Sequence, residues 1–285
     1  MKRILLSSPA KLNLFLKVNF KRKDGYHDLA TIFERIDLCD RIRLSPNKAG
    51  RIRISCKNAL VPKGPRNLAF KAAQMLKDNF KVKEGVNISI LKHIPIAAGL
   101  GGGSSNAATV LLGLNRLWKL GLTKKKLLDY AKRLGSDVPF FIYGASWALG
   151  TGRGDRIKPL FLPLKLWHIL IVLKRKVYTK QIFGALNLRL TKKNADVNIL
   201  RRALEKSDLA RIGRLLFNDL EAPILRSHPN LLKIKEKLQS LRPEAVSFSG
   251  SGPSIFALAK SQKDAYCLKR VLKKTYSQVF VVRTF

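Results

Sequence analysis

The stretch Pro95-Ile-Ala-Ala-Gly-Leu-Gly-Gly-Gly-Ser-Ser105 decides how the first half of this chain is interpreted. Before it, apolar residues alternate with polar ones over 86–90, which predicts a strand. After it, the mostly apolar run 106–119 predicts a buried helix. Glycine lets the backbone approach a ligand closely, and a helix N-terminus presents unpaired N–H groups to an anion. The stretch therefore predicts a phosphate-binding loop that joins a strand to a helix.

Two better-known phosphate loops do not match this stretch. A P-loop is excluded because no Gly-Lys-Ser/Thr follows the glycines. The dinucleotide fingerprint is excluded because Ser104 stands where its third glycine belongs. A flexible linker is the remaining alternative. The consecutive glycine and serine residues 101–105, flanked by a strand and a helix, favour the ligand loop.

Composition narrows the class of protein. The chain has 285 residues, of which 46% are hydrophobic and 26% charged, so one large or two modest domains can bury a substantial core. No apolar run reaches the roughly 18–20 residues that a membrane helix needs, and the N-terminus lacks a signal-peptide core. The 3 cysteines and 4 histidines show neither a disulfide framework nor metal-ligand spacing. These features favour a cytoplasmic protein.

Net charge is the unusual feature of the composition. The 56 Lys and Arg against 18 Asp and Glu give +38 at pH 7, which suggests anionic partners. The positive charge is spread over both halves without a basic tail, and aromatic residues are not interleaved with it as in RNA-binding segments. We therefore expect nucleic-acid binding to be non-specific at most. A dedicated RNA-binding protein without catalysis is kept as an alternative.

The N-terminal half has a clear local pattern. Apolar alternation over 12–18 predicts a two-faced strand that places Lys11 and Asn13 on the same side. Asp24-Gly25 predicts the tight turn of a hairpin. Further strands are expected at 42–44 and 52–54, and helices at 67–80 and from the capping residue Thr123 to Gly135.

A boundary is expected at the glycine-rich segment 144–154 and at the prolines Pro159 and Pro163 that follow it. Helices and strands segregate rather than alternate regularly, which predicts an α+β fold in two lobes. Beyond the boundary the pattern predicts strands at 167–173, 244–249, 254–258 and 278–283, and helices near 197–206, 208–218, 229–241 and 262–274.

Three further sites have residues suited to chemistry, and each also has an ordinary structural interpretation. Asp137 follows a helix-ending glycine and precedes Val-Pro-Phe-Phe, as an N-cap would. Lys11 on a strand face is usually a solvated lysine. Residues 249–254, Ser-Gly-Ser-Gly-Pro-Ser, are compatible with an ordinary turn. The local pattern leaves these alternatives open.

Five motifs occur in order along the chain: Pro9-Ala-Lys-Leu-Asn-Leu-Phe-Leu16, Asp24-Gly-Tyr-His27, the loop 95–105 with the Asn-Ala-Ala after it, Ser136-Asp-Val-Pro139 and Ser249-Gly-Ser-Gly-Pro253. In this combination the chain resembles the GHMP kinase superfamily, essentially end to end. The resemblance implies a two-lobed fold, with an N-terminal lobe like ribosomal protein S5 domain 2 and a ferredoxin-like C-terminal lobe. It divides the chain into an N-terminal domain with the ATP phosphate loop, 1–155, and a C-terminal domain, 156–285.

The resemblance also implies roles for individual residues. Lys11 and Asp137 fall on the catalytic pair, in which the aspartate accepts the proton of the attacking alcohol and the lysine keeps it ionised. The substrate site is matched by Asn13, Tyr26, His27, Thr179 and Phe183, with Tyr26, His27 and Phe183 around a cytosine ring. The ATP site is matched by Lys92, Pro95, Ile96, Ala97, Ala98, Gly99, Leu100, Gly101, Gly102, Gly103, Ser104 and Ser105.

These matches imply an ATP- and Mg²⁺-dependent kinase that phosphorylates a hydroxyl of a cytidylylated small molecule in non-mevalonate isoprenoid biosynthesis. The Gly-Tyr-His motif favours this branch, and a homoserine- or mevalonate-type kinase is kept as an alternative. The metal ligands stay unassigned, although Ser104 or Ser105 could offer a hydroxyl. Asp155 and Tyr178 depart from the family pattern, which usually has glutamate and a small residue or proline there. We expect a monomer or weak homodimer without membrane association.

Overall fold

A computed structural model describes residues 3–173, 177–188 and 195–285. The chain forms two units whose segments interleave along the sequence. The first unit contains Met1–Ala10, Leu38–Ile96 and Gly101–Ala145, and the second contains Lys11–Asp37, Ala97–Leu100 and Ser146–Phe285. Two long strands, β1 (Ile4–Lys21) and β2 (His27–Asn47), contribute residues to both units.

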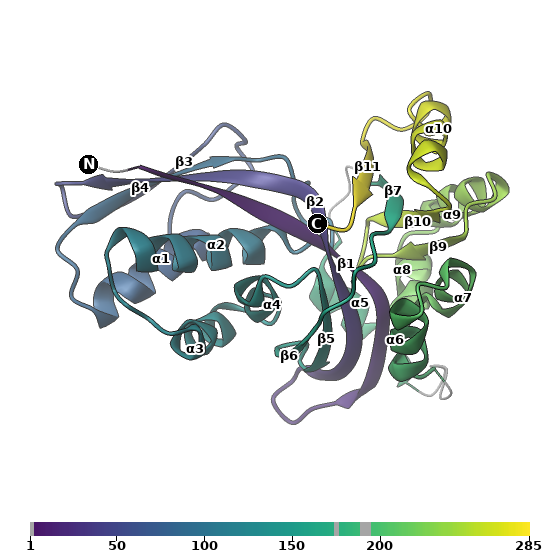
Figure 1. Ribbon diagram of the computed structural model, residues 1–285, viewed down its shortest axis with the longest axis horizontal. Coiled ribbons are helices and arrows are strands. Elements are labelled where there is room, and N and C mark those ends of the chain that lie inside the picture. The colour runs from purple at the N-terminus through teal and green to yellow at the C-terminus, as the bar shows by residue number, and fades with distance from the viewer. Residues whose placement is uncertain (1–2, 174–176, 189–194) are drawn as a thin grey trace. The chain divides into compact units, whose positions relative to one another are not determined.

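The first unit packs helices against a sheet. Its strand β3 (Ile52–Cys56) runs parallel to β4 (Gly85–Leu91), and β4 pairs antiparallel with the second part of β2. The register aligns Ile54, Ile88 and Leu44, which are all buried. Figure 1 shows the first two helices side by side along one face of these strands. The helices are α1 (Leu68–Asn79), α2 (Gly102–Leu117), α3 (Lys124–Leu134) and α4 (Val138–Tyr143).

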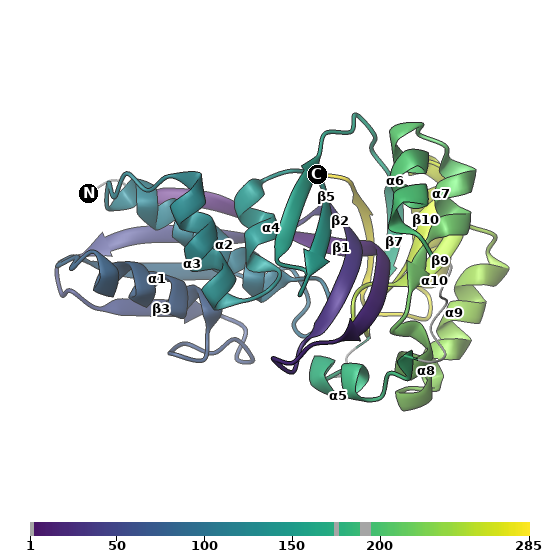
Figure 2. The ribbon, with the colours of Figure 1, turned by 90° about the horizontal axis from the view of Figure 1, so that it is seen from below.

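The second unit contains two sets of strands. The first part of β2 pairs antiparallel with β5 (Trp147–Gly152), which forms a hairpin with β6 (Arg156–Leu160), and Figure 2 shows β5 beside β2. In the same unit β1 pairs in parallel with β8 (Phe217–Asn218). A separate four-stranded antiparallel sheet has the order β11-β7-β10-β9 and consists of β7 (Trp167–Ile171), β9 (Ala245–Phe248), β10 (Ile255–Ala259) and β11 (Val279–Arg283).

Helices cover the four-stranded sheet with an apolar layer. Successive side chains of a strand point to opposite faces, so Ile169 and Ile171 share one face of β7. They belong to the same buried cluster as Leu238 of α9 (Asn230–Ser240) and Leu268 of α10 (Gln262–Leu272). This arrangement fits the ferredoxin-like lobe that the sequence implies. The helices of the second unit include α5 (Thr179–Gly184), α6 (Val197–Glu205), α7 (Leu209–Leu215), α8 (Glu221–Ser227), α9 (Asn230–Ser240) and α10 (Gln262–Leu272).

Most local predictions are confirmed. The strand at 12–18 lies within β1, and Asp24-Gly25 lies in the turn between β1 and β2. The hydroxyl of Thr123 accepts the N–H of Lys126 and caps α3 as expected. Two sheets with segregated helices confirm the α+β fold. None of the helices in the described ranges is long and apolar enough to cross a membrane.

Two local expectations differ from the structure. The helix expected near 208–218 ends at Leu215, and Phe217–Asn218 form the strand β8, which pairs with β1. The helix after the phosphate loop begins at Gly102, before the apolar run that starts at Asn106. Glycines and serines fill its first turn, so neither apolar spacing nor a polar cap marks the start in the sequence.

Candidate active site

The start of the glycine-rich loop is held by a buried carboxylate. Asp40 on β2 is fully buried, and its Oδ1 accepts the backbone N–H groups of His93 and Ile94, each at 2.8 Å. Its Oδ2 accepts the Lys92 ammonium at 2.8 Å. Lys92 also donates to the carbonyl of Ile94. The pair therefore fixes the direction in which the chain leaves β4.

Lys92 is the basic residue expected near the nucleotide. Burial lowers its pKa from the ordinary lysine value, and the attraction of Asp40 opposes that change. A buried ammonium must be bonded to offset its lost hydration, and Asp40 provides that bond. In the structure Lys92 thus stabilises the segment that enters the loop, through its bonds to Asp40 and the Ile94 carbonyl. Its contact with the nucleotide stays a prediction.

The loop ends in the first turn of α2. Gly101 precedes the helix with φ +67°, and no side chain caps the helix start. The first N–H groups of a helix have no acceptor four residues earlier and carry the positive end of its dipole. Ser105 is fully buried and accepts the Ser8 hydroxyl at 2.8 Å, whereas Ser104 is partly exposed. Of the two serines, Ser104 therefore has the more accessible hydroxyl.

The middle of the loop is held within the second unit by residues 249–254, the serine turn. Ser249 Oγ donates to the Gly99 carbonyl at 3.1 Å, and Ser254 Oγ donates to the Ala98 carbonyl at 2.5 Å. Gly99 has φ +74°, and a Cβ there would lie 2.3 Å from the Ser249 carbonyl oxygen. Only glycine fits so close an approach in the left-handed region. The serine turn therefore supports the loop rather than merely reversing the chain.

Lys11 and Asn13 share one face of β1, as the alternation predicts. Lys11 is only 4% exposed, so the interpretation as a solvated lysine is wrong. Its ammonium donates to Asn13 Oδ1 and lies 5.5 Å from the centroid of the Phe33 ring. Asn13 Nδ2 in turn donates to Thr31 Oγ1 at 2.8 Å. This chain of bonds orients a buried cation beside the serine turn.

Asp137 precedes α4 in the first unit. It occupies the N-cap position, yet its side chain makes no capping hydrogen bond to that helix. The side chain is partly exposed. Asp137 therefore has the N-cap position that the sequence suggests, but its side chain does not make the hydrogen bond that defines a cap. Helix capping does not account for an aspartate at this place.

The aromatic residues expected around a cytosine lie in the second unit. The rings of His27 and Phe183 stack with their centroids 5.1 Å apart and their planes inclined by 29°. The Tyr26 ring is 53% exposed, and the Arg153 guanidinium carbon lies 4.9 Å from its centroid. Burial lowers the pKa of His27, with repulsion from Lys21 as a second cause. The structure thus pairs Phe183 directly with His27 and pairs Tyr26 with Arg153.

Two further contacts concern residues that the sequence singled out. Asp155 accepts the backbone N–H of Arg153 at 3.2 Å and its guanidinium at 3.0 Å, so this carboxylate shapes the β5–β6 turn and holds the cation beside Tyr26. Thr179 Oγ1 lies 2.9 Å from Ser251 Oγ of the serine turn. Both contacts lie within the second unit.

The predicted site residues are divided between the units. The second unit brings together Lys11, Asn13, residues 97–100, the serine turn and Thr179. The first unit contains Lys92, residues 95–96, residues 101–105 and Asp137. In the part of the chain that the structure describes, no group of three or more His, Cys, Asp or Glu is suited to hold a metal ion.

Sequence reasoning missed the partners that hold these residues. Asp40, Thr31 and Ser8 each bond to a site residue from a distant part of the chain. No local signal marks them, because their partners are set by strand pairing and not by spacing along the chain. The serine turn is the exception, since its Ser-Gly-Ser-Gly-Pro motif is visible in the sequence.

Comparison with known families assigns the class. The model described as "GHMP kinases N terminal domain" matches residues 67–145, and "GHMP kinases C terminal" matches residues 200–278. The chain belongs to the GHMP kinase family, the ATP-dependent small-molecule kinases that the phosphate loop and the two sheets suggest.

The branch of the family follows from full-length relatives named 4-diphosphocytidyl-2-C-methyl-D-erythritol kinase. The one from Geobacillus kaustophilus (strain HTA426) is 43% identical over 282 residues, covering 99% of this chain and 97% of the relative. The one from Bacillus subtilis (strain 168) is 42% identical over 281 residues, covering 99% and 96%. A crystal structure of 4-(cytidine 5'-diphospho)-2C-methyl-D-erythritol kinase matches with a TM-score of 0.85 and 32% identity, covering 98% of both chains. Homoserine kinase from Cytophaga hutchinsonii shares the fold, with a TM-score of 0.76 and 21% identity over 100% of this chain and 95% of its own.

Proposed function

We propose that this chain transfers the γ-phosphoryl group of ATP to the 2-hydroxyl of 4-diphosphocytidyl-2-C-methyl-D-erythritol. The products are ADP and the 2-phosphate, and the step belongs to non-mevalonate isoprenoid biosynthesis. The observation that carries the proposal is the similarity to kinases of that name over 99% of this chain. The buried Lys11–Asn13 pair supports it, because a solvated surface would not need such an arrangement.

Phosphate binding is assigned to the glycine-rich loop and the start of α2. Phosphoryl transfer depends more on positioning and charge neutralisation than on covalent chemistry by the protein. The N–H groups of the first helical turn would hold phosphate oxygens. Mg²⁺ keeps several waters and binds substrate phosphates beside a few protein ligands, and the partly exposed Ser104 hydroxyl would be one such ligand. Bound Mg²⁺ would neutralise charge on the phosphates.

The chemical step is assigned to Asp137 and Lys11. In this proposal Asp137 accepts the proton of the 2-hydroxyl as that oxygen forms a bond to the γ-phosphorus, while the bond from this phosphorus to the ADP oxygen breaks. Lys11 supplies a positive charge that stabilises the negative charge developing on the attacking oxygen. Asn13 accepts a hydrogen bond from Lys11 and so limits where the ammonium can lie.

Recognition of the substrate is assigned to Tyr26, His27, Phe183 and Thr179. The lowered pKa of His27 keeps its imidazole neutral near pH 7, with one donor and one acceptor for the polar edge of a base. Aromatic faces bind bases by stacking without regard to their sequence context. The His27–Phe183 stack and the exposed Tyr26 ring supply such faces in one unit.

Coupled ADP release with the purified protein tests the proposal. The cytidylylated substrate, homoserine and mevalonate are offered in parallel at equal concentration, each with ATP and Mg²⁺. We expect turnover with the cytidylylated substrate alone. Turnover with homoserine or mevalonate would assign the chain to another branch of the same fold. RNA retention that survives raised salt, without any ATP turnover, would revive the RNA-binding alternative.

We also propose that the protein acts in the cytoplasm as a monomer or weak homodimer and binds nucleic acid non-specifically at most. Its cysteines Cys39, Cys56 and Cys267 are free thiols, as suits a reducing compartment. The division into an N-terminal domain with the phosphate loop, 1–155, and a C-terminal domain, 156–285, stays a prediction. Sedimentation over a range of protein concentrations tests the oligomeric state.

A further inference from the structure

Asn218, at the end of β8, uses all of its side-chain hydrogen-bonding groups. It is 6% exposed. Its Nδ2 donates to the carbonyl oxygens of Phe248 at 3.0 Å and Gly250 at 2.9 Å, and its Oδ1 accepts the N–H of Leu220 at 2.9 Å. A carboxamide offers two donor hydrogens and an acceptor without carrying a charge. Asn218 therefore connects the end of β8 to the serine turn.

The strand that bears Asn218 is itself fixed to β1, which also carries Lys11. Asn218 pairs with Leu16 in the parallel register of the two strands. The next residue, Asp219, accepts the N–H of Val18 at 2.7 Å and donates its own N–H to the Leu16 carbonyl at 2.9 Å. Both bonds are made by the residue that follows Asn218, so together with the strand pairing they fix the position of Asn218 relative to β1.

The serine turn also contacts the site residues of the second unit, which include residues 98–99 of the phosphate loop and Thr179. Its serines support the carbonyls of Ala98 and Gly99 in the phosphate loop, and Ser251 bonds with Thr179. Gly250 faces β1, because a Cβ there would lie 3.5 Å from Lys11 Nζ and 3.3 Å from Asn13 Oδ1. A shift of Gly250 would therefore reach both the phosphate loop and the lysine.

The backbone of the serine turn makes two hydrogen bonds of its own, from the N–H of Gly252 to the Ser249 carbonyl at 3.0 Å and from the N–H of Ser249 to the Ser254 carbonyl at 3.1 Å. Neither of these two bonds uses the carbonyl of Gly250. Gly250 has φ +57° and Gly252 has φ +74°, and glycine populates many other conformations at little cost. The carbonyl of Gly250 is one of the two that Asn218 binds. The hydrogen bond from Asn218 thus restrains the Gly250 carbonyl from outside the turn, which the flexible glycines of the turn do not do themselves.

We propose that Asn218 is a positioning residue of this kinase. Its carboxamide holds the Phe248 and Gly250 carbonyls, and thereby keeps the serine turn where the phosphate loop and Lys11 require it. The inference rests on the proposed function, since it concerns the same ATP and substrate sites. Asn218 itself touches no reacting atom in this scheme and acts through the turn.

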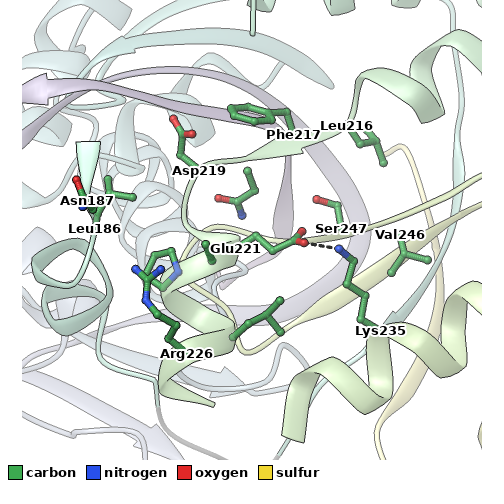
Figure 3. Close-up of a pocket in the computed structure, with 14 residues that line it drawn as sticks. Leu186, Asn187, Leu216, Phe217, Asp219, Glu221, Arg226, Lys235, Val246 and Ser247 are labelled. Atoms are coloured by element: carbon green, nitrogen blue, oxygen red, sulfur yellow. Dashed lines mark hydrogen bonds and ion pairs between the residues drawn. The ribbon is translucent and has the colours of Figure 1, made fainter. Parts of the chain in front are cut away.

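A cavity beside Asn218 supplies a matched control. Asn218 lines a cavity of about 420 Å³ together with Asp219, Glu221 and Lys235. Figure 3 shows the ion pair between Glu221 and Lys235 in this cavity. A substitution at Lys235 removes that pair and leaves the three bonds of Asn218 in place. The cavity also gives space beside position 218, so a side chain of equal or smaller size does not overpack the region.

The experiment compares Asn218→Asp, Asn218→Ala and Lys235→Gln with the wild type. Asn218→Asp keeps the shape of the side chain and the oxygen that accepts the Leu220 N–H. It replaces the NH₂ group, which donates to the Phe248 and Gly250 carbonyls, with an oxygen that cannot donate when ionised. We measure kcat and both KM values well below every melting temperature, and express kcat per folded molecule. Small misplacements of catalytic groups cost up to about 100-fold, so we expect kcat to fall roughly 10- to 100-fold in both Asn218 variants. Lys235→Gln should keep the wild-type kcat.

A pH profile separates positioning from stability alone. Protonation of the carboxyl introduced in Asn218→Asp restores one donor, so the ratio of variant to wild-type kcat should rise as pH is lowered. Asn218→Ala, which gains no such donor, should show a flat ratio. Wild-type kcat per folded molecule in both Asn218 variants, whatever their melting temperatures, would overturn the inference. A wild-type protein inactive on the cytidylylated substrate would instead count against the proposed function.

Discussion

His27 and Phe183 stack with ring centroids 5.1 Å apart, although one residue begins β2 and the other lies in α5. Phe183 also packs against the apolar cluster of the second unit. The same ring therefore has a contact with the core and, in the proposed function, a contact with the cytosine of the substrate. Loss of a core contact lowers stability, whereas loss of a stacking face lowers affinity for one substrate only.

The substitution Phe183→Ala distinguishes these two contributions. Base stacking on an aromatic ring contributes about 1–3 kcal/mol, which corresponds to roughly 5- to 150-fold in affinity. We expect KM for the cytidylylated substrate to rise by that factor and KM for ATP to stay unchanged. Phe161→Ala, at a ring that is 90% exposed, is the control. A melting temperature lowered as for a core aromatic, with both KM values unchanged, would contradict the stacking role.

The lowered pKa of His27 predicts a direction for the pH dependence of stability. Its folded pKa lies below the unfolded histidine value of about 6.5 because burial and Lys21 disfavour the charged form. Protonation therefore favours the unfolded chain. The contribution of His27 is complete above the unfolded value and is lost as pH falls through the folded pKa. Melting temperatures in this window should fall more in the wild type than in His27→Gln, and parallel curves would refute the assignment.

The substitution Asp137→Asn tests the proposed general base. Removal of a positioned base lowers kcat by about 10²–10⁴-fold, while KM for ATP should barely move because this side chain is not assigned to the phosphates. The melting temperature is measured in parallel and kcat is expressed per folded molecule, so that a change in stability is separated from the loss of the base. Asp129→Asn, on the exposed side of α3, is the control. Near wild-type turnover in Asp137→Asn would remove the residue from the mechanism.

The substitution Gly99→Ala tests the close approach inside the phosphate loop. The added Cβ would lie 2.3 Å from the Ser249 carbonyl oxygen, at a φ of +74°. The left-handed conformation alone costs a non-glycine residue about 1–2 kcal/mol, and the clash adds to it. We expect ATP affinity measured by calorimetry to fall at least tenfold. Gly64→Ala is the control, because a Cβ there would have no heavy atom within 4 Å and Gly64 lies outside the predicted sites. Equal affinities in both variants would show that the loop tolerates displacement at Gly99.

A buried carboxylate in the second unit predicts a change of stability without a change of mechanism. Glu34 is fully buried, accepts the Thr284 hydroxyl at 2.6 Å and lies 2.7 Å from His168 Nε2. Glu34→Ala leaves the buried His168 Nε2 and the Thr284 hydroxyl without this partner, and an unsatisfied buried polar group costs about 1–3 kcal/mol. Urea denaturation should report that loss, with kcat per folded molecule unchanged. Glu236→Ala on the exposed face of α9 should stay within about 0.5 kcal/mol of the wild type. Similar losses in both variants would argue against a special role for Glu34.

Local sequence is sufficient for the elements that carry the site. Alternation over 12–18 places Lys11 and Asn13 on one face, because successive side chains of a strand point to opposite sides. Thr123 and Gly135 mark the two ends of α3 through the backbone groups that a helix leaves unpaired. The glycines of the loop and of the serine turn mark the places where the backbone comes close to other groups. These features depend on neighbours along the chain, so the sequence by itself determines them.

Only the tertiary structure decides what holds the site residues in place. Lys92 finds Asp40 52 residues away, and Asn218 finds the carbonyl of Gly250 32 residues away. In the local pattern each of these side chains is equally compatible with a solvated surface. Periodicity reports which face of an element is apolar, but it does not report which polar groups the fold will shield from water. Those groups must find a partner inside the protein, and strand pairing between distant segments decides which partner is within reach.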